Sequence, residues 1–353
     1  MTSESVRKRF QNGLHVATKL SDVAKLADVS ISTVSRTLNA PEKVRPALAQ
    51  RVRRAIEELH YVPDAAGRAL ASRRSRTIGA IIPTLSNPIF AAGIQAMECR
   101  LNECGYALII GSSEYAAARQ HRQVMTLIER GVDGLVLHGL SGSEQSLGLI
   151  EERGLPFVNI WSYKEDAAHP CIGFDNLEIA KRLAGYLLDL GHRHFAVIAG
   201  ITHENDRATD RVEGVRAALL ERGVNLEESR VVEKPYGIGE GRDGFRAVFR
   251  GPGPPPTAII AGNDLLALGA IIEAHSSGMS VPGDLSVAGI DDVELAGHLE
   301  PGLTTMRVPS DKLGRLAADH IIDRLEGRPV EEKYRVEVEL IVRGSTAPPP
   351  PPR

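Results

Sequence analysis

The sequence predicts a chain of two parts: a small all-α module at the amino terminus, then a two-lobed α/β domain with parallel sheets. Residues 20–39 hold two short amphipathic segments joined by a tight turn. From Thr77 onward, short apolar runs alternate with amphipathic helical segments, the pattern of a parallel sheet covered by helices on both faces. The pattern restarts at His194, so we expect two similar lobes.

The first two predicted helices form a helix-turn-helix with an outward face suited to DNA. Val23 and Ala27 line the buried side of the first helix, and Ser30 is placed to cap a second helix. The outward side of that second helix carries small hydroxyl groups and one guanidinium, on Ser32, Thr33, Ser35 and Arg36. Such groups can contact phosphates and base edges in the major groove of B-DNA. The alternative is a helical hairpin whose outer face is only solvated.

Charge is distributed unevenly along the chain. Residues 1–76 contain 15 Lys and Arg but 7 Asp and Glu, a net charge of +8. The remaining residues contain 27 and 38, a net charge of −11. A basic module can replace counterions on DNA phosphates, and an acidic remainder limits non-specific contact with DNA. The charge split therefore favours DNA binding over the solvated hairpin.

A third helix and a basic connector follow. The third helix is predicted over 46–60, because Pro46 suits a first helical turn and Pro63 lies beyond the helix end. The connector, 64–76, has Ala-rich helical potential that Gly67 weakens, and it is too short to be a stable helix alone in water. Two interpretations stay open for it: a helix that forms on a polyanion, or a plain basic linker.

The α/β part is expected to enclose a cleft. Buried strands are predicted over 78–82, 107–110, 134–137, 156–160, 195–199, 258–261 and 286–289. A long helix, 177–190, precedes the second set of strands. In open α/β sheets ligands bind beyond the carboxyl ends of the strands, so two facing lobes would form a site for a small ligand.

Composition excludes several classes of protein. The chain has 353 residues, enough for two or three domains, and 42% hydrophobic residues. It contains no run of about eighteen apolar residues that would span a bilayer, and no apolar segment follows the basic residues near the amino terminus. We therefore expect no membrane partner and no secretion signal. Three cysteines without a CxxC spacing fit a reducing cytoplasm, and we expect no disulfide framework, no bound metal and no cofactor.

Motifs along nearly the whole chain resemble those of the LacI/GalR family of bacterial transcription regulators. They are DVAKLADVSISTVSRTLN, ELHYVPDAAGRALA, IGAIIPTLSNPIFA, RGVDGLVLHG, LGHRHFAVIAG, GNDLLALGA, VPGDLSVAGIDD and LTTMRVP, in the family's order and spacing. The resemblance implies an all-α helix-turn-helix DNA-binding domain, a hinge, and a two-lobed sensor similar to periplasmic binding proteins. Within the family, PTLSNPIFA and CIGFDNLEIA look most similar to gluconate-type repressors.

The resemblance also implies which residues contact operator DNA. Base-edge contacts are implied for Ile31, Ser32 and Arg36, and phosphate contacts for Thr18, Thr33, Ser35 and Asn39. Of these, Arg36 is suited to a bidentate contact with guanine. Leu70 matches a hinge leucine that two subunits insert together into the minor groove. Asp64 and Gly67 depart from the family's usual Asn and Ala, which puts the stability of the hinge helix in doubt.

For the sensor, the resemblance implies an effector held between the lobes. The implied contacts are Phe90, Trp161, Arg211, Asn263 and Asp291. Asp291 and Asn263 can hydrogen-bond adjacent hydroxyls of a sugar. Trp161 stands where relatives often have Asp, and two roles stay open for it: stacking on a ring, or filling the cleft wall. Gly239 stands where several relatives have an aromatic residue, and Tyr236 is a candidate substitute.

The charge of the effector is left open by the sequence. Arg207 and Arg211 lie four apart on a predicted helix and could face an anion together, which would favour a sugar acid. The alternative is that Arg207 pairs at the surface with Asp206, Asp210 or Glu213.

No catalytic constellation supports an enzyme. Residues 239–244 have the form GxGxxG, but no clear strand leads into them, so they are interpreted as glycines of a polar loop. His192 and His194 are two apart, a spacing that suits neither HExxH nor a pair on one helix face. Asp291 and Asp292 lack a nucleophile or histidine partner. We therefore expect no catalytic residues.

These observations predict a ligand-responsive, sequence-specific DNA-binding transcriptional regulator, in the simplest case a repressor of carbohydrate or sugar-acid metabolism genes. It would bind a palindromic operator as a homodimer, and a small effector (a sugar, sugar acid or related polar metabolite) would control that binding. It would be cytoplasmic, and on the nucleoid when bound to DNA. The rival is a sugar-type solute-binding protein, against which the basic module and the missing export signal argue.

The predicted organisation has five segments. They are a disordered extension (1–17), the helix-turn-helix domain (18–63), the hinge helix or linker (64–76), the effector-binding and dimerisation domain (77–343) and a disordered proline-rich tail (344–353). The tail contains five consecutive prolines, 348–352, and no leucine heptad, so we expect a dimer without a tetramerising coiled coil.

Overall fold

The computed structural model describes residues 18–62, 74–142 and 144–351. The chain separates into two compact units, with the boundary between Ser75 and Arg76. The predicted extension 1–17 and most of the predicted hinge, including Leu70, lie outside the described residues. Among the described helices, none is both long and apolar enough to cross a membrane.

The small unit is all-α, as predicted. Its elements are α2 (Leu20–Leu26), α3 (Ile31–Asn39), the 3-10 turn η1 (Pro41–Lys43) and α4 (Pro46–Glu58). Ser30 caps α3, because its hydroxyl oxygen accepts the Thr33 N–H at 3.1 Å. Pro46 occupies the first turn of α4, where a missing N–H costs nothing. The three helices close over a small apolar core made of Val23, Ala24, Ala27, Val34, Val52, Ala55, Leu59 and Tyr61.

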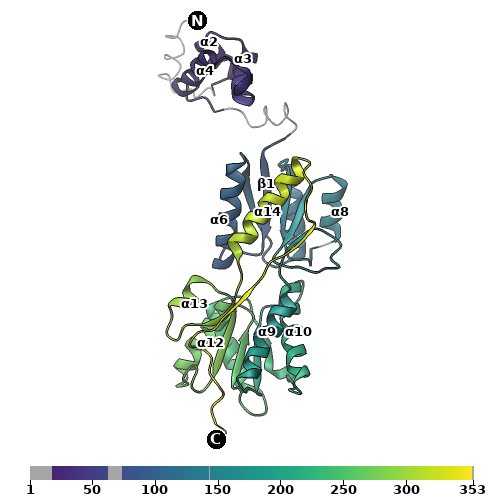
Figure 1. Ribbon diagram of the computed structural model, residues 1–353, viewed down its shortest axis with the longest axis vertical. Helices are drawn as coiled ribbons and strands as arrows, with labels where there is room; N and C mark the ends of the chain where they lie inside the picture. Colours follow the sequence, from purple (N-terminus) through teal and green to yellow (C-terminus); the bar gives the residue numbers. More distant parts are fainter. Residues whose placement is uncertain (1–17, 63–73, 143, 352–353) are drawn as a thin grey trace. The chain divides into compact units, whose positions relative to one another are not determined.

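The large unit holds two sheets, one in each lobe (Figure 1). The amino-terminal lobe has the order β11-β5-β4-β3-β1-β2, and all its strands are parallel. These strands are β1 (Thr77–Ile82), β2 (Ala107–Ser112), β3 (Gly134–His138), β4 (Phe157–Ile160), β5 (Cys171–Gly173) and β11 (Lys333–Arg335). Every residue of β3 and β4 is buried, which is why they form apolar runs in the sequence.

The carboxyl-terminal lobe repeats this arrangement with one difference. Its order is β12-β10-β9-β8-β6-β7, and only the pair β10 and β12 is antiparallel in the described sheet. The strands are β6 (Phe195–Ala199), β7 (Val231–Glu233), β8 (Ala258–Ala261), β9 (Ser286–Asp291), β10 (Thr304–Arg307) and β12 (Glu339–Ile341). All seven predicted strands are present, and five short ones (β5, β7, β10, β11, β12) were not predicted.

Helices flank both sheets. The sequence pattern did not predict to which lobe two of them, one before His194 and one near the carboxyl terminus, belong. Helix α9 (Asn176–Asp189) packs against α10 (Asp206–Glu221) in the carboxyl-terminal lobe (Figure 1), so that lobe begins before His194. Helix α14 (Ser310–Leu325) returns to the amino-terminal lobe and packs against α6 (Pro88–Glu103). Their contact needs glycine, because a Cβ on Gly314 would lie 2.0 Å from the carbonyl oxygen of Gly93.

The remaining helices complete the layers over the sheets. They are α7 (Ala117–Glu129), α8 (Glu144–Glu152), α11 (Ile238–Arg250), α12 (Asp264–Ser276) and α13 (Glu294–His298). The GxGxxG residues lie within α11, so the prediction of a polar loop at 239–244 is wrong. Gly241 is buried where α11 packs on α12, and a Cβ there would lie 2.3 Å from the Leu266 carbonyl oxygen. Gly241 therefore serves the packing of α11 on α12, and Gly244 lets α11 approach Ile198 of β6.

Residues 345–347 are held in place by the carboxyl-terminal lobe, contrary to the prediction of a disordered tail from residue 344. Ser345 is fully buried. Its hydroxyl donates to the Val287 carbonyl at 2.6 Å and accepts the Thr304 N–H at 2.8 Å. The Ala347 N–H donates to the Ser286 hydroxyl at 3.0 Å. The prolines predict an extended tail, but the residues before them hydrogen-bond to β9 and β10.

Removing this segment is expected to destabilise the large unit. Deletion of 344–353 breaks several buried hydrogen bonds worth about 1 kcal/mol each, so we expect the free energy of unfolding to fall by about 1–3 kcal/mol. Deletion of 350–353 retains every bond made by Ser345 and Ala347 and should change stability by less than about 0.5 kcal/mol. Urea denaturation of both truncations measures the difference; equal stabilities would contradict an anchoring role.

Candidate functional site

The outward face of α3 presents the residues predicted to read DNA. Ile31 is 52% exposed, and Ser32 and Arg36 are exposed beside it, whereas Thr33 and Ser35 are half-buried. The three share one face because α3 turns its apolar side, with Val34 fully buried, toward α2 and α4. The Ser32 hydroxyl also hydrogen-bonds the Ser30 hydroxyl at 2.8 Å.

Two further polar side chains hold the helices that support this face. The Thr18 hydroxyl donates to the Leu59 carbonyl at 3.3 Å, so it ties the start of α2 to the end of α4. Arg51 on α4 donates to the carbonyls of Ala27 and Asp28 at 2.6 and 3.0 Å, which holds the turn between α2 and α3. The sequence did not reveal this role for Arg51. The side chain of Asn39 and the whole of Leu70 lie outside the described residues.

A second candidate site lies between the two lobes of the large unit. Parallel strands end at the same edge of a sheet, and both sheets bring their carboxyl ends to this cavity. From the amino-terminal lobe come His138, the last residue of β3, and Trp161, which follows β4. From the carboxyl-terminal lobe come Asn263, which follows β8, and Asp291, the last residue of β9.

About 310 Å³ of the cavity is not occupied by atoms, and part of this space is open to solvent. Its lining residues are Asn87, Ile89, Phe90, Tyr115, His138, Trp161, Arg207, Arg211, Tyr236, Asn263 and Asp291. All five residues implied as effector contacts are among them. Tyr236 also lines it, whereas Gly239 does not. Asn87, Ile89, Tyr115 and His138 were not predicted; for His138 the available signal was that it directly follows the predicted strand 134–137.

Three aromatic rings pack together on the amino-terminal side of the cavity. The His138 and Trp161 rings stack with centroids 5.2 Å apart, and Phe90 contacts both edge-on, at 4.8 and 5.5 Å. Trp161 has a positive φ of 71°, and its ring lies where a Cβ on Gly93 would be, at 2.5 Å. Trp161 therefore forms part of the cavity wall, and its position depends on a glycine in α6.

Several buried polar atoms of the cavity have no hydrogen-bond partner among the described residues. They are both ring nitrogens of His138, Nε1 of Trp161 and Nδ2 of Asn263. The Asn263 amide is oriented by its other atom, because Oδ1 accepts the Leu266 N–H at 3.0 Å as the cap of α12. Unpaired buried polar groups cost about 1–3 kcal/mol each, so a polar ligand that pairs with them gains affinity.

Arg211 is fixed by the protein rather than free in the cavity. Its Nε donates to Asn176 Oδ1 at 2.9 Å, and its Nη1 donates to the Gly262 carbonyl at 2.6 Å. Asn176 in turn donates to the Trp161 carbonyl at 3.1 Å. Asn176 was not predicted, and it joins the arginine to the tryptophan.

Burial dominates the ionisation of the acidic and imidazole groups in the cavity. Burial raises the pKa of Asp291 to about 8, although the charge of Arg211 opposes the shift. Burial also raises the pKa of Asp264, just behind the cavity, to about 6. The pKa of His138 is lowered by burial and by the charges of Arg207 and Arg211, so its ring is neutral at physiological pH.

These raised pKa values predict that stability falls as the pH rises through about 8. An aspartate with a folded pKa of about 8 and an ordinary unfolded pKa binds more protons when folded, so unfolding becomes easier as pH increases in this interval. Buried neutral histidines act in the opposite direction, but only below about pH 6.5. Between about pH 6.5 and 8.5 we expect a loss of at most about 1.4 kcal/mol per pH unit. Chemical denaturation across this range should show a slope that Asp291→Asn removes; an identical slope in that variant would contradict the assignment.

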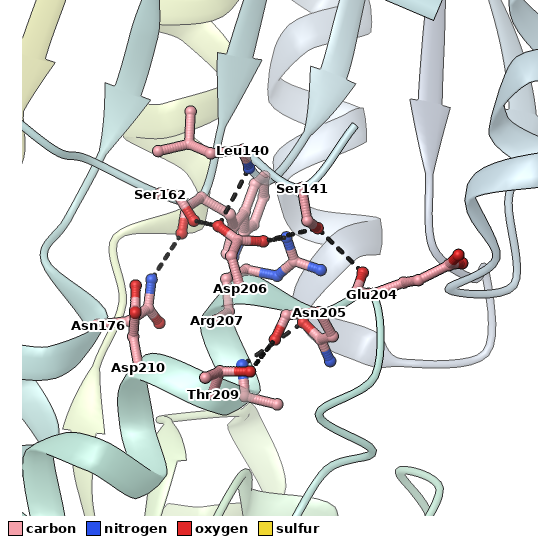
Figure 2. A network of polar contacts seen from close by, with 12 residues as sticks. Leu140, Ser141, Ser162, Asn176, Glu204, Asn205, Asp206, Arg207, Thr209 and Asp210 are labelled. Carbon is pink, nitrogen blue, oxygen red and sulfur yellow. Dashed lines mark hydrogen bonds and ion pairs between the residues drawn. The ribbon is translucent and has the colours of Figure 1, made fainter. Parts of the chain in front are cut away.

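A polar network crosses between the lobes beside the cavity (Figure 2). The Asp206 carboxylate, at the start of α10, accepts three hydrogen bonds from the amino-terminal lobe: from the Ser162 hydroxyl at 2.6 Å, the Leu140 N–H at 3.0 Å and the Ser141 hydroxyl at 3.1 Å. It also pairs with Arg207 at 2.9 Å. Burial alone would raise the pKa of Asp206, but the arginine and the hydrogen bonds outweigh it and lower the pKa. The carboxylate is therefore ionised and joins the two lobes.

The described residues contain no group of three or more His, Cys, Asp or Glu side chains placed to hold a metal ion. Asp292 does not line the cavity. Its carboxylate pairs with Arg307 and Arg343, each at 2.7 Å. His192 hydrogen-bonds Thr257 at 2.9 Å and is buried in the carboxyl-terminal lobe.

Known proteins resemble the chain over more than nine tenths of its length. A match to "Bacterial regulatory proteins, lacI family" covers residues 19–64, and a match to "Periplasmic binding protein-like domain" covers 184–346. The chain is 32% identical to the HTH-type transcriptional repressor CytR of Escherichia coli (strain K12), over 94% of this chain and 96% of the relative. It is 33% identical to the ribose operon repressor of the same organism, over 92% and 99%. A LacI-family transcriptional regulator from Silicibacter pomeroyi has a similar structure, with a TM-score of 0.84 at 27% identity, over 93% of this chain and 99% of that chain.

Proposed function

Because the chain belongs to the LacI family of bacterial regulatory proteins, we propose that α3 reads operator DNA and that a small effector in the central cavity controls this binding. The chain is a DNA-binding transcriptional repressor with a sensor domain, as its relatives are. Nothing supports the rival interpretation as a solute-binding protein. The relatives are repressors and not enzymes, and we propose that this chain also lacks catalytic activity.

In this proposal, base edges are read by Ile31, Ser32 and Arg36. Their exposure on one face of α3 supports the assignment. Arg36 supplies most of the discrimination, because a bidentate pair with guanine is worth about 1–3 kcal/mol against the wrong base, whereas Ile31 can only contact a thymine methyl. Phosphate contacts are assigned to Thr18, Thr33, Ser35 and Asn39, and the minor-groove wedge to Leu70.

The effector is proposed to contact Phe90, Trp161, Arg211, Asn263 and Asp291. The observation that carries the proposal is that these residues, far apart in the sequence and drawn from both lobes, line one cavity with unpaired polar groups. The name of one relative specifies a ribose operon, which agrees with a sugar-sized, hydroxyl-bearing ligand for this chain. We propose a role in controlling genes of carbohydrate metabolism, in the cytoplasm.

Coupling between the sites follows from lobe geometry. An effector that binds one closure state better shifts the population toward it, and this changes the spacing of the segments that enter the two readers of a homodimer. An effector that favours the operator-competent state strengthens repression, and one that favours the other state relieves it. We propose a homodimer on a near-palindromic operator, for which sedimentation should give twice the mass of the 353-residue chain.

A ligand screen followed by operator titration tests the proposed function. A bound effector at about 100 times its Kd should stabilise the folded protein by about 2.7 kcal/mol, which raises the melting temperature measurably. Each stabilising compound should then change operator affinity, and the same compounds should not stabilise Arg211→Ala. Compounds that raise the melting temperature but leave operator affinity unchanged would contradict the coupling.

A further inference from the structure

We propose that Asp264 is the residue that positions Asp291 in the central cavity, by holding the turn that follows β9. Asp264 does not line the cavity itself. It is the first residue of α12, and its side chain is fully buried in the carboxyl-terminal lobe. The positioning is a property of the fold, and its consequence for an effector rests on the proposed function of the cavity.

The turn after β9 has a backbone conformation that needs support. Asp291 and Asp292 have φ values of 126° and 56°, in a region that residues with a side chain rarely adopt. Two successive residues of this kind, neither of them glycine, persist only where the surrounding structure holds them. In this conformation Asp291 lines the cavity, whereas Asp292 does not. The place of the Asp291 carboxylate therefore depends on the contacts that fix the turn.

Asp264 supplies this support with both of its carboxylate oxygens. Oδ2 accepts the N–H of Val293, which follows the two strained residues, at 2.9 Å. Oδ1 accepts the Thr305 hydroxyl at 2.6 Å. The Thr305 hydroxyl oxygen in turn accepts the Asp292 N–H at 3.4 Å. Two successive N–H groups of the turn are thus held, one by Asp264 directly and one through Thr305 of β10.

These contacts of Asp264 are not those of a helix cap. Asn263 already caps α12, since its Oδ1 accepts the Leu266 N–H. The two hydrogen bonds of the Asp264 side chain go instead to β10 and to the turn before α13. Gly289 of β9 leaves room for the carboxylate, because a Cβ there would lie 2.3 Å from Asp264 Oδ1. A glycine in β9 and an aspartate in α12 together hold the turn.

The turn brings Asp291 to a partner in the opposite lobe. The Asn87 side chain, at the start of α6, hydrogen-bonds the Asp291 carboxyl group. Asn87 Oδ1 accepts the Ile89 N–H at 3.2 Å as the cap of α6, which leaves Nδ2 to donate to Asp291. Asp264 therefore acts on the contact between the lobes inside the cavity, although it touches neither the cavity nor the opposite lobe through the hydrogen bonds described above.

Hydrogen exchange of the full-length protein tests the inference without any ligand. Asp264→Ala removes both acceptor oxygens, so exchange of the Val293 N–H should become at least about tenfold faster relative to the amides of β8, a strand in the middle of its sheet. Asp264→Asn should restore slow exchange. Its amide oxygen can accept the Val293 N–H, and its amide nitrogen can donate to Thr305 Oγ.

Asp284→Ala is the matched control in the same lobe. Asp284 also accepts a backbone N–H and a hydroxyl, both from Ser280, at 2.9 and 2.8 Å. Its removal should speed exchange at Ser280 and leave exchange of the Val293 N–H unchanged. Gly289→Ala is an independent variant, because it displaces the Asp264 carboxylate and leaves every donor of the turn in place. It should also speed exchange of the Val293 N–H.

Calorimetric titration of the same variants with D-ribose and D-glucose measures the consequence for binding. A sugar that binds the unmodified protein should bind Asp264→Ala at least about tenfold more weakly, and Asp264→Asn within about threefold of the unmodified protein.

The outcomes separate this inference from the proposed function. Unchanged exchange of the Val293 N–H in Asp264→Ala, or exchange in Asp264→Asn as fast as in Asp264→Ala, would overturn the inference and leave the proposed function standing. Equal sugar affinities of the unmodified protein and Asp264→Ala would also overturn it. Failure of both sugars to bind the unmodified protein would count against the proposed class of effector, and the exchange rates would still decide the role of Asp264.

Discussion

Replacing Arg36 with alanine is expected to remove most of the protein's preference for its operator while leaving non-specific DNA binding in place. Arg36 is the one guanidinium on the exposed face of α3, beside Ile31 and Ser32. A bidentate contact with guanine contributes about 1–3 kcal/mol, so the ratio of specific to non-specific affinity should fall by roughly 5- to 150-fold. The residual binding should weaken steeply with salt, because it comes from phosphate contacts.

Arg53→Ala is the matched control for this experiment. Arg53 is exposed on α4, and its loss removes the same charge from the small unit without changing α3. We expect Arg53→Ala to weaken binding to all sequences about equally, with at most a reduced salt dependence. Titrations with operator and scrambled DNA at two salt concentrations give both quantities. A specificity ratio in Arg36→Ala equal to that of the unmodified protein would contradict the role of α3 as the base reader.

Replacing Asp206 with alanine is expected to cost more stability than any other single change proposed for the large unit. It leaves Arg207 as a buried, unpaired cation and removes the acceptor for Ser162, Ser141 and the Leu140 N–H. Breaking a buried ion pair by removing one partner typically costs about 3–5 kcal/mol. The change also removes three hydrogen bonds between the lobes, so the operator affinity should respond differently to the effector. Urea denaturation and operator titrations with and without effector measure the two effects.

Asp210→Ala provides the comparison on the same helix. Asp210 also pairs across the lobes, with Lys164 at 3.2 Å, but the lysine side chain is 47% exposed. Exposed ion pairs are worth about 0–1 kcal/mol, so this variant should lose less than about 1 kcal/mol. If Asp206→Ala were no less stable than Asp210→Ala, the network beside the cavity would not be the main link between the lobes.

The elements that were predicted well are those with a strong local signal. A capping serine, Ser30, and apolar residues on one helical face predict a helix over 31–38, and α3 spans Ile31–Asn39. The predicted strands at 134–137 and 195–199 are fully buried, so their composition is apolar throughout. The strands that were missed, such as β5 and β12, are three residues long, too short to show a periodicity.

The candidate site was predicted in part, and there is a physical reason why some of its residues were predicted and others were not. The resemblance to a family indicated Phe90 and Asp291, which lie in the cavity, but it could not indicate Asn176, whose role is to hold Arg211 and Trp161. For Arg207 both alternatives hold in part: it lines the cavity, yet it pairs with Asp206, in a buried rather than a surface pair. Such pairings depend on distances between residues from different elements.

The sequence by itself determined the all-α module, the parallel α/β strands and the exposed polar face of α3, because each depends on periodicity within a few residues of the chain. Only the tertiary structure decided which charges of the cavity wall are paired, where the second lobe begins and why residues 344–347 are held in place. These outcomes depend on contacts between residues far apart in the sequence. Ser162 meets Asp206, and Ser345 meets Val287, only because the folded lobes bring them together.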